Sequence, residues 1–375
     1  MSGDLPPVRI HALLQHRGGA TGIARAVFEG CVREGGDCAF SHELAEGEGD
    51  GDELVSASEV GAWVARTPGA LAHVHGSLDW EACLGGLSGH APLVVTLHDC
   101  GLLTGGCPYP LDCDQWSAGC AHCERNFPAS AERRAARREA VRLARPVLVS
   151  PSRWLANMAR EALPDADVRV IPNGVPWPEH LPAKVEARRE IGLAPGVKLV
   201  LFAAHGGRDA AYKAGDKWEA LWQRIKLAVP EAVCFMVGGE VHERRGDLFL
   251  WPYVDGETML RFMRAADVLA YPTMADNHSL VVLEAMSMEL PCVAFGVGGI
   301  PEQIVSGETG IVVAPGQWEA MESAVVRVLR DPGLGRRMGR EAFERGRMRF
   351  SRERMVADHL RLYRRLSQRE RELRG

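Results

Sequence analysis

The segment ADNHSLVVLEAMSMELPCVAFGVGGIPE, residues 275–302, decides the fold that we expect for the second half of the chain. A polar loop covers 276–278, and Ser279 then stands where an N-cap residue would start an apolar helix. Residues 291–295 follow as a short apolar run with the length of a buried parallel strand. A loop, a helix, a strand and a Gly-rich turn at 298–302 follow one another, and this order of elements is typical of an α/β domain.

The same segment carries groups suited to a nucleotide and a sugar. The first amides of the expected helix point out of its N-terminus and offer a site for a diphosphate. Asp276 lies before the helix, where a carboxylate can reach sugar hydroxyls, and Glu284 lies about one and a half turns inside it. A carboxylate at Glu284 can accept hydrogen bonds from a ribose diol. An ordinary capped helix with a surface glutamate is the simpler interpretation, but it leaves the combination of these carboxylates with the turn at 298–302 unexplained.

Outward from this segment, short apolar runs alternate with helical segments in both halves of the chain. The second half has expected strands at 198–204, 233–237, 268–271, 291–295 and 311–313. The first half has them at Val8–Leu14, Leu71–His75, Leu93–His98, Val147–Ser150 and Val168–Val170. This alternation predicts an α/β architecture of two parallel sheets, each covered by helices, as two Rossmann-like domains facing each other across a cleft.

The length of 375 residues also exceeds what one hydrophobic core usually serves. The Pro-rich stretch 172–182 has the composition of a domain linker. We therefore predict an N-terminal Rossmann-like domain at 1–172, with a Cys-rich loop at 100–123, and a C-terminal Rossmann-like domain at 173–350. A last amphipathic helix, 351–375, is expected to pack back toward the N-terminal domain.

The composition is that of a soluble globular protein, with 46% hydrophobic and 25% charged residues. A net charge of -5 provides no overall basic field to attract phosphates, so nucleic acid is not an expected partner. The first residues lack the pattern of a secretory signal, and no run approaches the roughly 18 apolar residues of a spanning helix. We expect a cytoplasmic protein whose 10 cysteines meet a reducing environment.

At this point the sequence resembles a known family, the retaining GT-B glycosyltransferases of the family 4 group. Their Glu-x7-Glu signature is written here as Asp276-x7-Glu284, followed by LEAM and GGIPE. VSPSRWLANMAR (149–160) and VRVIPNGV (168–175) stand where such enzymes carry similar strings. The resemblance therefore extends over most of the chain, and it implies a hexosyl transfer from a nucleotide diphosphate sugar.

The resemblance also implies roles for individual residues. Arg208 and Lys213, in GGRDAAYKAGD (206–216), match the basic pair that the family uses on the donor diphosphate. Asp276 and His98 take the catalytic positions next to the transferred sugar, and Asp276 is one methylene shorter than the usual Glu. The remaining donor-binding positions are Gly19, Ser279, Leu280 and Glu284.

On residue chemistry alone, three of these assignments have simpler alternatives. Gly18 and Gly19 follow the first strand, where glycines let a backbone approach a phosphate, but such a pair by itself indicates only a tight turn. A histidine at a strand end, such as His98, is often structural. Exposed basic residues such as Lys213 are usually only solvated.

The segment 98–123 resembles a subset of these enzymes, from exopolysaccharide and capsule pathways, that carries cysteines in this loop. Its C-x5-C-x6-C-x2-C pattern of thiols suits a tetrahedral structural zinc site. Free thiols and two disulfides stay open as alternatives. The four cysteines are Cys107, Cys113, Cys120 and Cys123.

The resemblance implies a front-face substitution in which the leaving diphosphate accepts the proton of the acceptor hydroxyl, with no cofactor required. The acceptor is a sugar, a lipid-linked molecule or a small molecule. Another GT-B enzyme, such as an epimerase or a phosphorylase, and a non-catalytic assembly protein are the alternatives. A zinc-held nucleic-acid reader is disfavoured by the acidic charge.

The helix expected at 131–145 carries Arg133, Arg134, Arg137, Arg138, Arg142 and Arg145. A solvated face is the first interpretation of such a charge run. The second is weak, salt-sensitive peripheral contact with anionic lipids at the inner membrane face.

Overall fold

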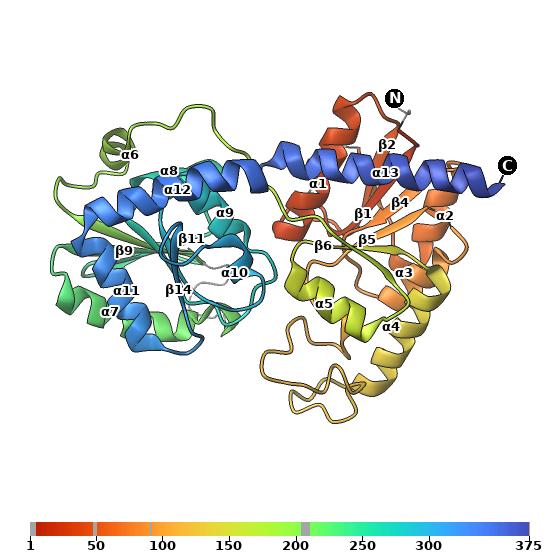
Figure 1. Cartoon of the computed structure of the whole chain (residues 1–375), viewed down its shortest axis with the longest axis horizontal. Coiled ribbons are helices and arrows are strands. Elements are labelled where there is room, and N and C mark those ends of the chain that lie inside the picture. The colour runs from red at the N-terminus through yellow and green to blue at the C-terminus, as the bar shows by residue number, and fades with distance from the viewer. Residues whose placement is uncertain (1–4, 48–50, 91, 204–210, 375) are drawn as a thin grey trace. The chain divides into compact units, whose positions relative to one another are not determined.

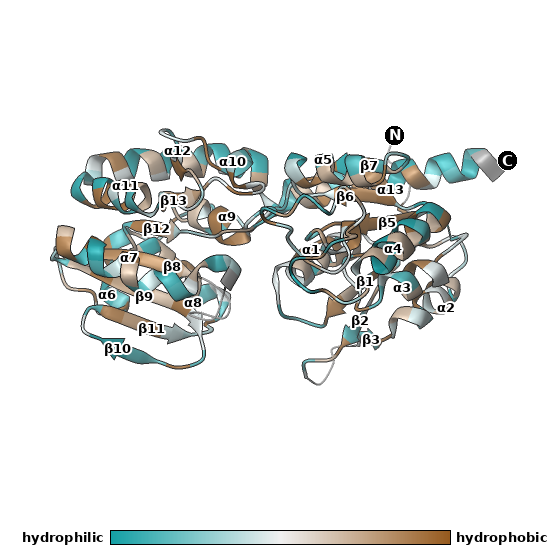
Figure 2. Cartoon of the chain, turned by 90° about the horizontal axis from the view of Figure 1, so that it is seen from below, coloured by the Kyte–Doolittle hydropathy of each residue, from teal (hydrophilic) through white to brown (hydrophobic). Residues whose placement is uncertain are grey.

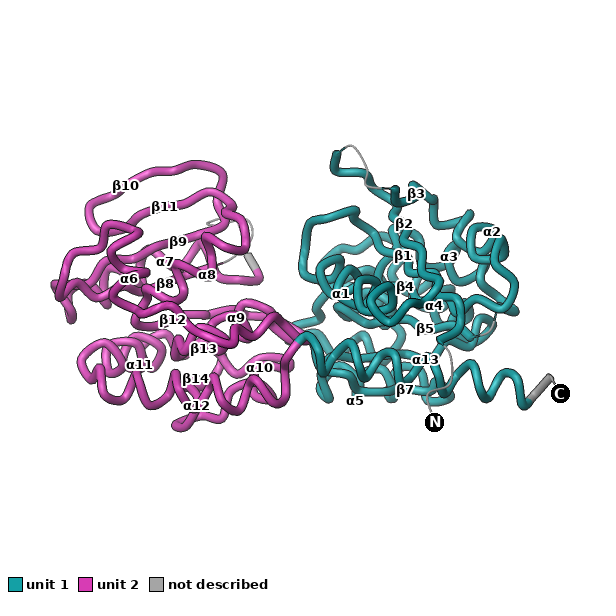
Figure 3. Tube along the Cα trace, turned by 90° about the horizontal axis from the view of Figure 1, so that it is seen from above, with its two compact units in different colours: residues 1–173, 352–375 teal, residues 174–351 magenta. Residues whose placement is uncertain are grey.

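The computed structural model describes residues 5–47, 51–90, 92–203 and 211–374. The chain divides into two compact units (Figure 3). Unit 1 comprises residues 1–173 together with 352–375, and unit 2 comprises 174–351. Each unit is built on one sheet with helices on its faces (Figure 1).

The sheet of unit 1 has the strand order β3-β2-β1-β4-β5-β6-β7, and its neighbouring strands pair in parallel. Parallel strands covered on both faces are continuous apolar runs, and β4 and β5 are buried at every residue. The order reverses between β1 and β4, which is the switch point where ligands bind in such sheets. The strands are β1 (Val8–Leu14), β2 (Cys38–Leu44), β3 (Glu53–Leu54), β4 (Leu71–Val74), β5 (Leu93–Thr96), β6 (Val147–Ser150) and β7 (Asp167–Val170).

Helices connect these strands, and local capping sets several of their ends. Ser152 accepts a hydrogen bond from the Leu155 amide at 3.1 Å and so starts α5. The helices of unit 1 are α1 (Gly19–Arg33), α2 (Val60–Ala65), α3 (Trp80–Gly86), α4 (Ser130–Ala144), α5 (Arg153–Ala162) and α13 (Arg352–Arg374), with short 3-10 turns η1 (Ala57–Glu59) and η2 (Gly101–Leu103).

The last helix, α13, is fixed to unit 1 although it follows all of unit 2 in the sequence. It packs against α1, where a Cβ on Gly30 would come within 2.2 Å of Val356 Cγ1. Buried Tyr363 also hydrogen-bonds through its hydroxyl to Nδ1 of His73 at 2.5 Å, on strand β4. The bare backbone of Gly30 thus permits the close approach that brings α13 to the sheet.

The sheet of unit 2 has the order β10-β11-β9-β8-β12-β13-β14. Only β10 pairs antiparallel among its described strands, with β11; the other neighbours are parallel, and the order reverses between β8 and β12. The strands are β8 (Lys198–Ala203), β9 (Ala232–Gly239), β10 (Glu243–Arg245), β11 (Leu248–Pro252), β12 (Val268–Tyr271), β13 (Cys292–Phe295) and β14 (Gly310–Val313).

The helices of unit 2 cover both faces of this sheet and enclose two apolar clusters, one on each side. Figure 2 shows most strands of this sheet as mainly hydrophobic and the edge strand β10 as hydrophilic, whereas the helices carry both kinds of residue. The helices are α6 (Lys184–Glu190), α7 (Gly215–Ala228), α8 (Gly256–Ala265), α9 (Leu280–Ser287), α10 (Ile300–Gln303), α11 (Trp318–Arg330) and α12 (Pro332–Phe350), with the 3-10 turn η4 (Ala211–Lys213).

The predicted strands are present, with ends that differ by a residue or two. The sequence analysis missed β2, β3, β10 and β11. Strand β2 has the sequence CAFSHEL, which is not a continuous apolar run and therefore gives no signal of a buried strand. Its polar side chains Ser41 and His42 are nevertheless buried. The Ser41 hydroxyl lies 2.9 Å from His11 Nδ1.

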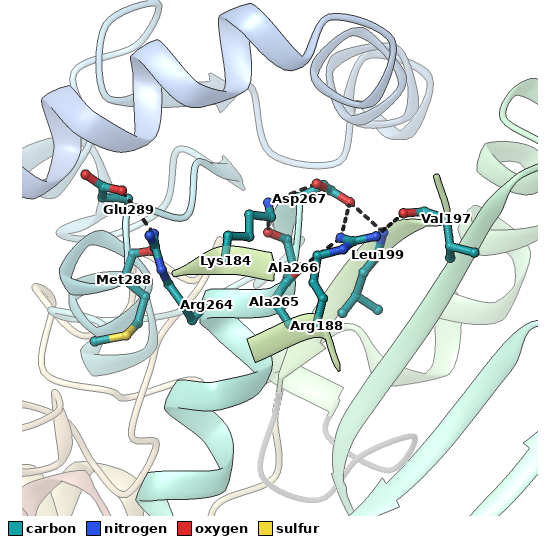
Figure 4. A network of polar contacts seen from close by, with 10 residues as sticks. All are labelled: Lys184, Arg188, Val197, Leu199, Arg264, Ala265, Ala266, Asp267, Met288 and Glu289. Carbon is teal, nitrogen blue, oxygen red and sulfur yellow. Dashed lines mark hydrogen bonds and ion pairs between the residues drawn. The ribbon is translucent and has the colours of Figure 1, made fainter. Parts of the chain in front are cut away.

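A polar network attaches α6 to the beginning of two central strands of unit 2 (Figure 4). The carboxylate of Asp267 accepts from Lys184 at 2.9 Å, from Arg188 at 3.3 Å and from the Leu199 amide at 2.8 Å. Burial alone would raise the pKa of Asp267, but Lys184, the Leu199 amide and Arg188 outweigh it and hold that pKa below its usual value. The carboxylate therefore stabilises the folded state in its charged form.

Asp267→Ala should lower the free energy of unfolding of unit 2 by about 2 kcal/mol, because two partly buried cations lose their acceptor. The loss should be full above pH 3.8, the ordinary value for Asp, and shrink as the pH falls through the lowered pKa. Calorimetric unfolding at several pH values measures it. Arg261→Ala, which breaks the exposed pair with Glu257, is the control and should cost less than about 0.5 kcal/mol. Equal effects of the two variants would contradict the assignment.

Candidate functional site

Three polar residues of unit 2 meet beyond the carboxyl ends of β8 and β12. The Lys213 ammonium donates to Asp276 Oδ2 at 2.5 Å and to the Tyr271 hydroxyl at 2.8 Å. The Tyr271 hydroxyl in turn donates to Asp276 Oδ2 at 2.7 Å. Burial, and then the Asp276 charge, raise the pKa of Tyr271 well above its usual value, so the phenol stays protonated and remains a donor.

The turn that carries Lys213 is held by backbone contacts. The Tyr212 carbonyl accepts from the Met274 amide at 2.7 Å and from the Thr273 hydroxyl at 3.2 Å. Ala214, directly after the lysine, has a φ of 57°, a left-handed conformation that is rare for alanine. Contacts to the loop after β12 thus determine where the lysine side chain begins.

The N-terminus of α9 lies next in sequence. Ser279 caps the helix by accepting from the Val282 amide, and its own amide donates to Gln303 Oε1 at 3.1 Å. Because the Ser279, Val282 and Leu283 amides already donate within the protein, an anion at this helix end would meet the amides of Leu280 and Val281. The Gly299 amide donates to the Asp276 carbonyl at 3.3 Å, so the loop and the Gly-rich turn are joined as well.

Glu284 is half-buried on α9. Burial is the cause that raises the pKa of its carboxyl, to about 7. A ligand that donates hydrogen bonds to this carboxylate would lower that pKa and would therefore bind more tightly to the deprotonated form.

Unit 1 has its own pocket of about 210 Å³ at the switch point between β1 and β4. Its lining includes Gly18, Gly19, Ser77, Trp80 and His98. Gly18 has a φ of 88°, a region that favours glycine, and it starts α1. The N-terminus of α1 therefore opens on the same pocket as the predicted histidine.

A hydrogen-bonded chain of buried histidines leads away from this pocket. His98 Nε2 lies 3.0 Å from His75 Nδ1, and His75 Nε2 lies 3.3 Å from His73 Nδ1, which also bonds Tyr363. Burial lowers the pKa of His98 to about 3 and those of His73 and His75 well below the usual value, so the chain is neutral. In neutral imidazoles each bond needs one donor, so the tautomers are coupled.

The Cys-rich loop gives the zinc interpretation no support. Among the described residues, which include all four cysteines, no group of three or more His, Cys, Asp or Glu side chains could hold a metal ion. All 10 cysteines are free thiols, so disulfides are not formed either. Instead the Gly105 amide donates to Cys120 Sγ at 3.2 Å and the Phe127 amide to Cys123 Sγ at 3.4 Å. Cys107 and Cys113 are buried and half-buried.

The arginines of α4 do not form one uniform face. Arg134 is buried and donates to the Ala162 carbonyl at 3.1 Å, and Arg137 is buried and donates to the Gly101 carbonyl at 2.5 Å. These two guanidinium groups hold neighbouring segments of unit 1 together, so they are not available to a membrane. The exposed members are Arg138, Arg142 and Arg145. No helix in the part of the chain that the structure describes is long and apolar enough to cross a membrane.

The structure thus brings Lys213 and Asp276 together, places Ser279, Leu280 and Glu284 on the adjacent helix, and puts Gly19 and His98 in one pocket of unit 1. Arg208 lies outside the described residues. Sequence reasoning missed Tyr271, Gln303 and His75. The available signals were a tyrosine at the end of an apolar strand and a second histidine at the end of the strand before the one that carries His98.

Comparison with known families matches residues 198–331 to the family described as glycosyl transferases group 1. D-inositol 3-phosphate glycosyltransferase of Segniliparus rotundus is 31% identical over 193 residues, which cover 46% of this chain and 41% of that protein. A glycogen synthase of Mycobacterium tuberculosis is 32% identical over 93 residues, 25% of this chain and 22% of that protein. The chain thus spans less than half the length of these curated relatives.

Solved structures cover far more of the chain. Sucrose-phosphate synthase from Thermosynechococcus elongatus has a TM-score of 0.75 at 19% identity, over 96% of this chain and 99% of that one. HepE of Anabaena, in complex with UDP-glucose, has a TM-score of 0.69 at 14% identity, over 94% and 99%. At these identities the likeness speaks for the fold, and the predicted α/β class with two Rossmann-like domains of the GT-B type is confirmed.

Glu284→Gln should raise the melting temperature at pH 8 and leave it nearly unchanged at pH 4.5. Between the ordinary pKa of 4.5 and about 7 the folded state binds more protons at this site, so the wild-type free energy of unfolding falls with rising pH. The uncharged amide removes that dependence. Scanning calorimetry at half-unit pH steps measures it, and a pH-independent difference between variant and wild type would contradict the raised pKa.

Proposed function

We propose that this GT-B chain is a retaining glycosyltransferase that moves a hexose from a nucleotide diphosphate sugar to a hydroxyl acceptor. The cluster of Lys213, Tyr271 and Asp276 is the observation that carries the proposal. It lies within the segment 198–331 that matches glycosyl transferases group 1. A cation and a carboxylate side by side, next to a helix N-terminus, suit a charged diphosphate joined to a polyhydroxylated sugar.

On the donor side, the Lys213 ammonium would exchange its contact with Asp276 for a diphosphate oxygen. Asp276 would then be released to accept hydrogen bonds from sugar hydroxyls, with Tyr271 still donating to its Oδ2. The amides of Leu280 and Val281 would bind phosphate oxygens, and Glu284 would bind the ribose diol. We keep Arg208 as the second cation of this set on the strength of the sequence match alone.

In the proposed reaction the bond between the sugar and the diphosphate breaks while the acceptor oxygen bonds to the same face of the anomeric carbon. The leaving diphosphate takes the acceptor proton. Lys213 offsets the negative charge that develops on that diphosphate, and its fixed position means little reorganisation during the step. The protein thus contributes orientation and charge, and no cofactor is assigned to the reaction.

The pocket of unit 1 is proposed to take the acceptor, with Gly19 and His98 at its wall. Burial lowers the pKa of His98 to about 3, so its ring is neutral and does not attract an ion, which suits the wall of a pocket for an uncharged sugar. His75 fixes the orientation of its ring through the 3.0 Å contact.

The donor base, the sugar and the acceptor are further parts of the proposal. UDP-glucose is the first donor to test, because a solved structure of the same fold was determined with it. A lipid-linked acceptor and peripheral membrane contact rest on the three exposed arginines of α4.

A transferase needs an acceptor for product formation, whereas an epimerase converts the donor without one and a phosphorylase needs inorganic phosphate.

Lys213→Ala should weaken binding of UDP or another nucleoside diphosphate by about tenfold or more, since a charge-assisted hydrogen bond is worth roughly 1.5–3 kcal/mol. Isothermal titration measures the affinity, and the melting temperature should fall far less than the affinity.

Lys217→Ala is the matched control, because Lys217 is an exposed lysine four residues further on, in contact with Trp318. Its nucleotide affinity should stay within about twofold of the wild type, as is usual for a surface substitution away from a site. Unchanged affinity in both Lys213→Ala and Arg208→Ala would overturn the donor-site assignment.

A further inference from the structure

A groove of about 460 Å³ lies in unit 1 between the edge strand β7 and the middle turns of α13. It is separate from the pocket that holds His98, with which it shares no lining residue. Figure 2 shows hydrophilic turns in this part of α13. The groove is lined by Asp167, Arg169, Val170, Ile171, Asp358, Arg361, Leu362, Arg365, Leu366 and Arg369.

The arginines form a regular row. Arg361, Arg365 and Arg369 recur every four residues on α13, so their Cα atoms are about 6 Å apart along one side of the helix. Arg169 faces the groove from β7. With four arginines and two aspartates in the lining, the groove carries an excess of two positive charges.

The two aspartates do not join the walls of the groove. Asp167 pairs with Arg169 at 2.6 Å on its own strand, and Asp358 pairs with Arg361 on its own helix. Arg365 and Arg369 are exposed, and no ion pair to either is found among the described residues. The charges of Arg365 and Arg369 are therefore available to a ligand.

An apolar strip runs beside the arginines. Leu362 and Leu366 lie one turn apart and are only half-buried, and Val170 on the strand is half-buried too. A ligand that lies along the groove would meet leucines at the same spacing as the arginines. Free phosphate has no apolar group that could pack on these leucines. A flat membrane surface fits a concave groove poorly.

We propose that this groove docks an acidic amphipathic helix of a partner protein. A helix lying alongside α13 repeats its side chains with the same rise, so carboxylates at every fourth residue would match the arginine row. Its leucines would pack on Leu362 and Leu366. Arginine pairs with carboxylates in a fork geometry, and an apolar helix face in a groove is a common mode of peptide recognition. The inference concerns binding alone and is independent of the proposed transferase activity.

The probe is a labelled synthetic helix in which Glu recurs every four residues with Leu beside each Glu. A second peptide has the same composition in scrambled order. Fluorescence anisotropy against the full chain should show the patterned peptide binding about fivefold or more tightly than the scrambled one, because only the first aligns both rows. Raising the salt concentration should weaken binding, as expected for exposed charges.

The double variant Arg365→Ser/Arg369→Ser should weaken binding of the patterned peptide about tenfold or more. The control Arg371→Ser/Arg347→Ser also removes two exposed arginines, one on the same helix outside the groove and one on α12, and should change affinity less than about twofold. Melting temperatures of both variants report that the fold is retained.

Equal binding of patterned and scrambled peptides would overturn the proposal, and so would equal affinities of the two double variants. Tripolyphosphate and phosphatidylglycerol vesicles are further arms of the same experiment. If either binds through Arg365 and Arg369 while the patterned peptide does not, the groove is an anion or lipid site and the proposal is wrong.

Discussion

Parallel strand pairing is the constraint on which the candidate site depends. In a parallel sheet every strand delivers its following loop to the same edge, so residues far apart in the sequence meet there. The loops after β8 and β12 bring Lys213 and Asp276 into contact across 63 positions of sequence. The loops after β4 and β5 do the same for His75 and His98 in unit 1. Each unit has its polar group at the point where the strand order reverses.

The two groups differ in their electrostatics. The group in unit 2 is charged and compact, with one ammonium, one carboxylate and a phenol that stays protonated beside them. The group in unit 1 is a neutral chain of imidazoles, because burial without a carboxylate partner disfavours their charged forms. A charged ligand and an uncharged one would therefore meet different environments in the two units.

Arginines show how one residue type serves several purposes in the same chain. On α4, Arg134 and Arg137 are buried and donate to backbone carbonyls. On α6, Arg188 shares a carboxylate with a lysine and a backbone amide. On α13, Arg365 and Arg369 are exposed on a groove. A run of arginines in the sequence predicts none of these differences, because partners at long range decide them.

The sequence by itself determined the fold class and indicated 275–302 as a segment of the candidate site. Apolar runs of strand length and the order of loop, helix, strand and turn in 275–302 are local features. Such features can be recognised in a single sequence because they involve only neighbouring residues. The sequence also indicated Lys213, Asp276 and Glu284, through the resemblance of their segments to motifs of a known family. It did not reveal Tyr271 or His75, since a buried polar residue inside an apolar strand has no periodic signature.

Only the tertiary structure decided which of the remaining groups meet. The thiols of 107–123 have a spacing that suits a metal, yet the loop is held by backbone contacts and does not bring three of them to one point. The last helix packs on unit 1 because Gly30 has no side chain to block Val356 and because the Tyr363 hydroxyl hydrogen-bonds to His73. The contact between Tyr363 and His73 joins positions 290 residues apart. The free energy of such contacts depends on close packing and burial, which exist only once the chain has folded.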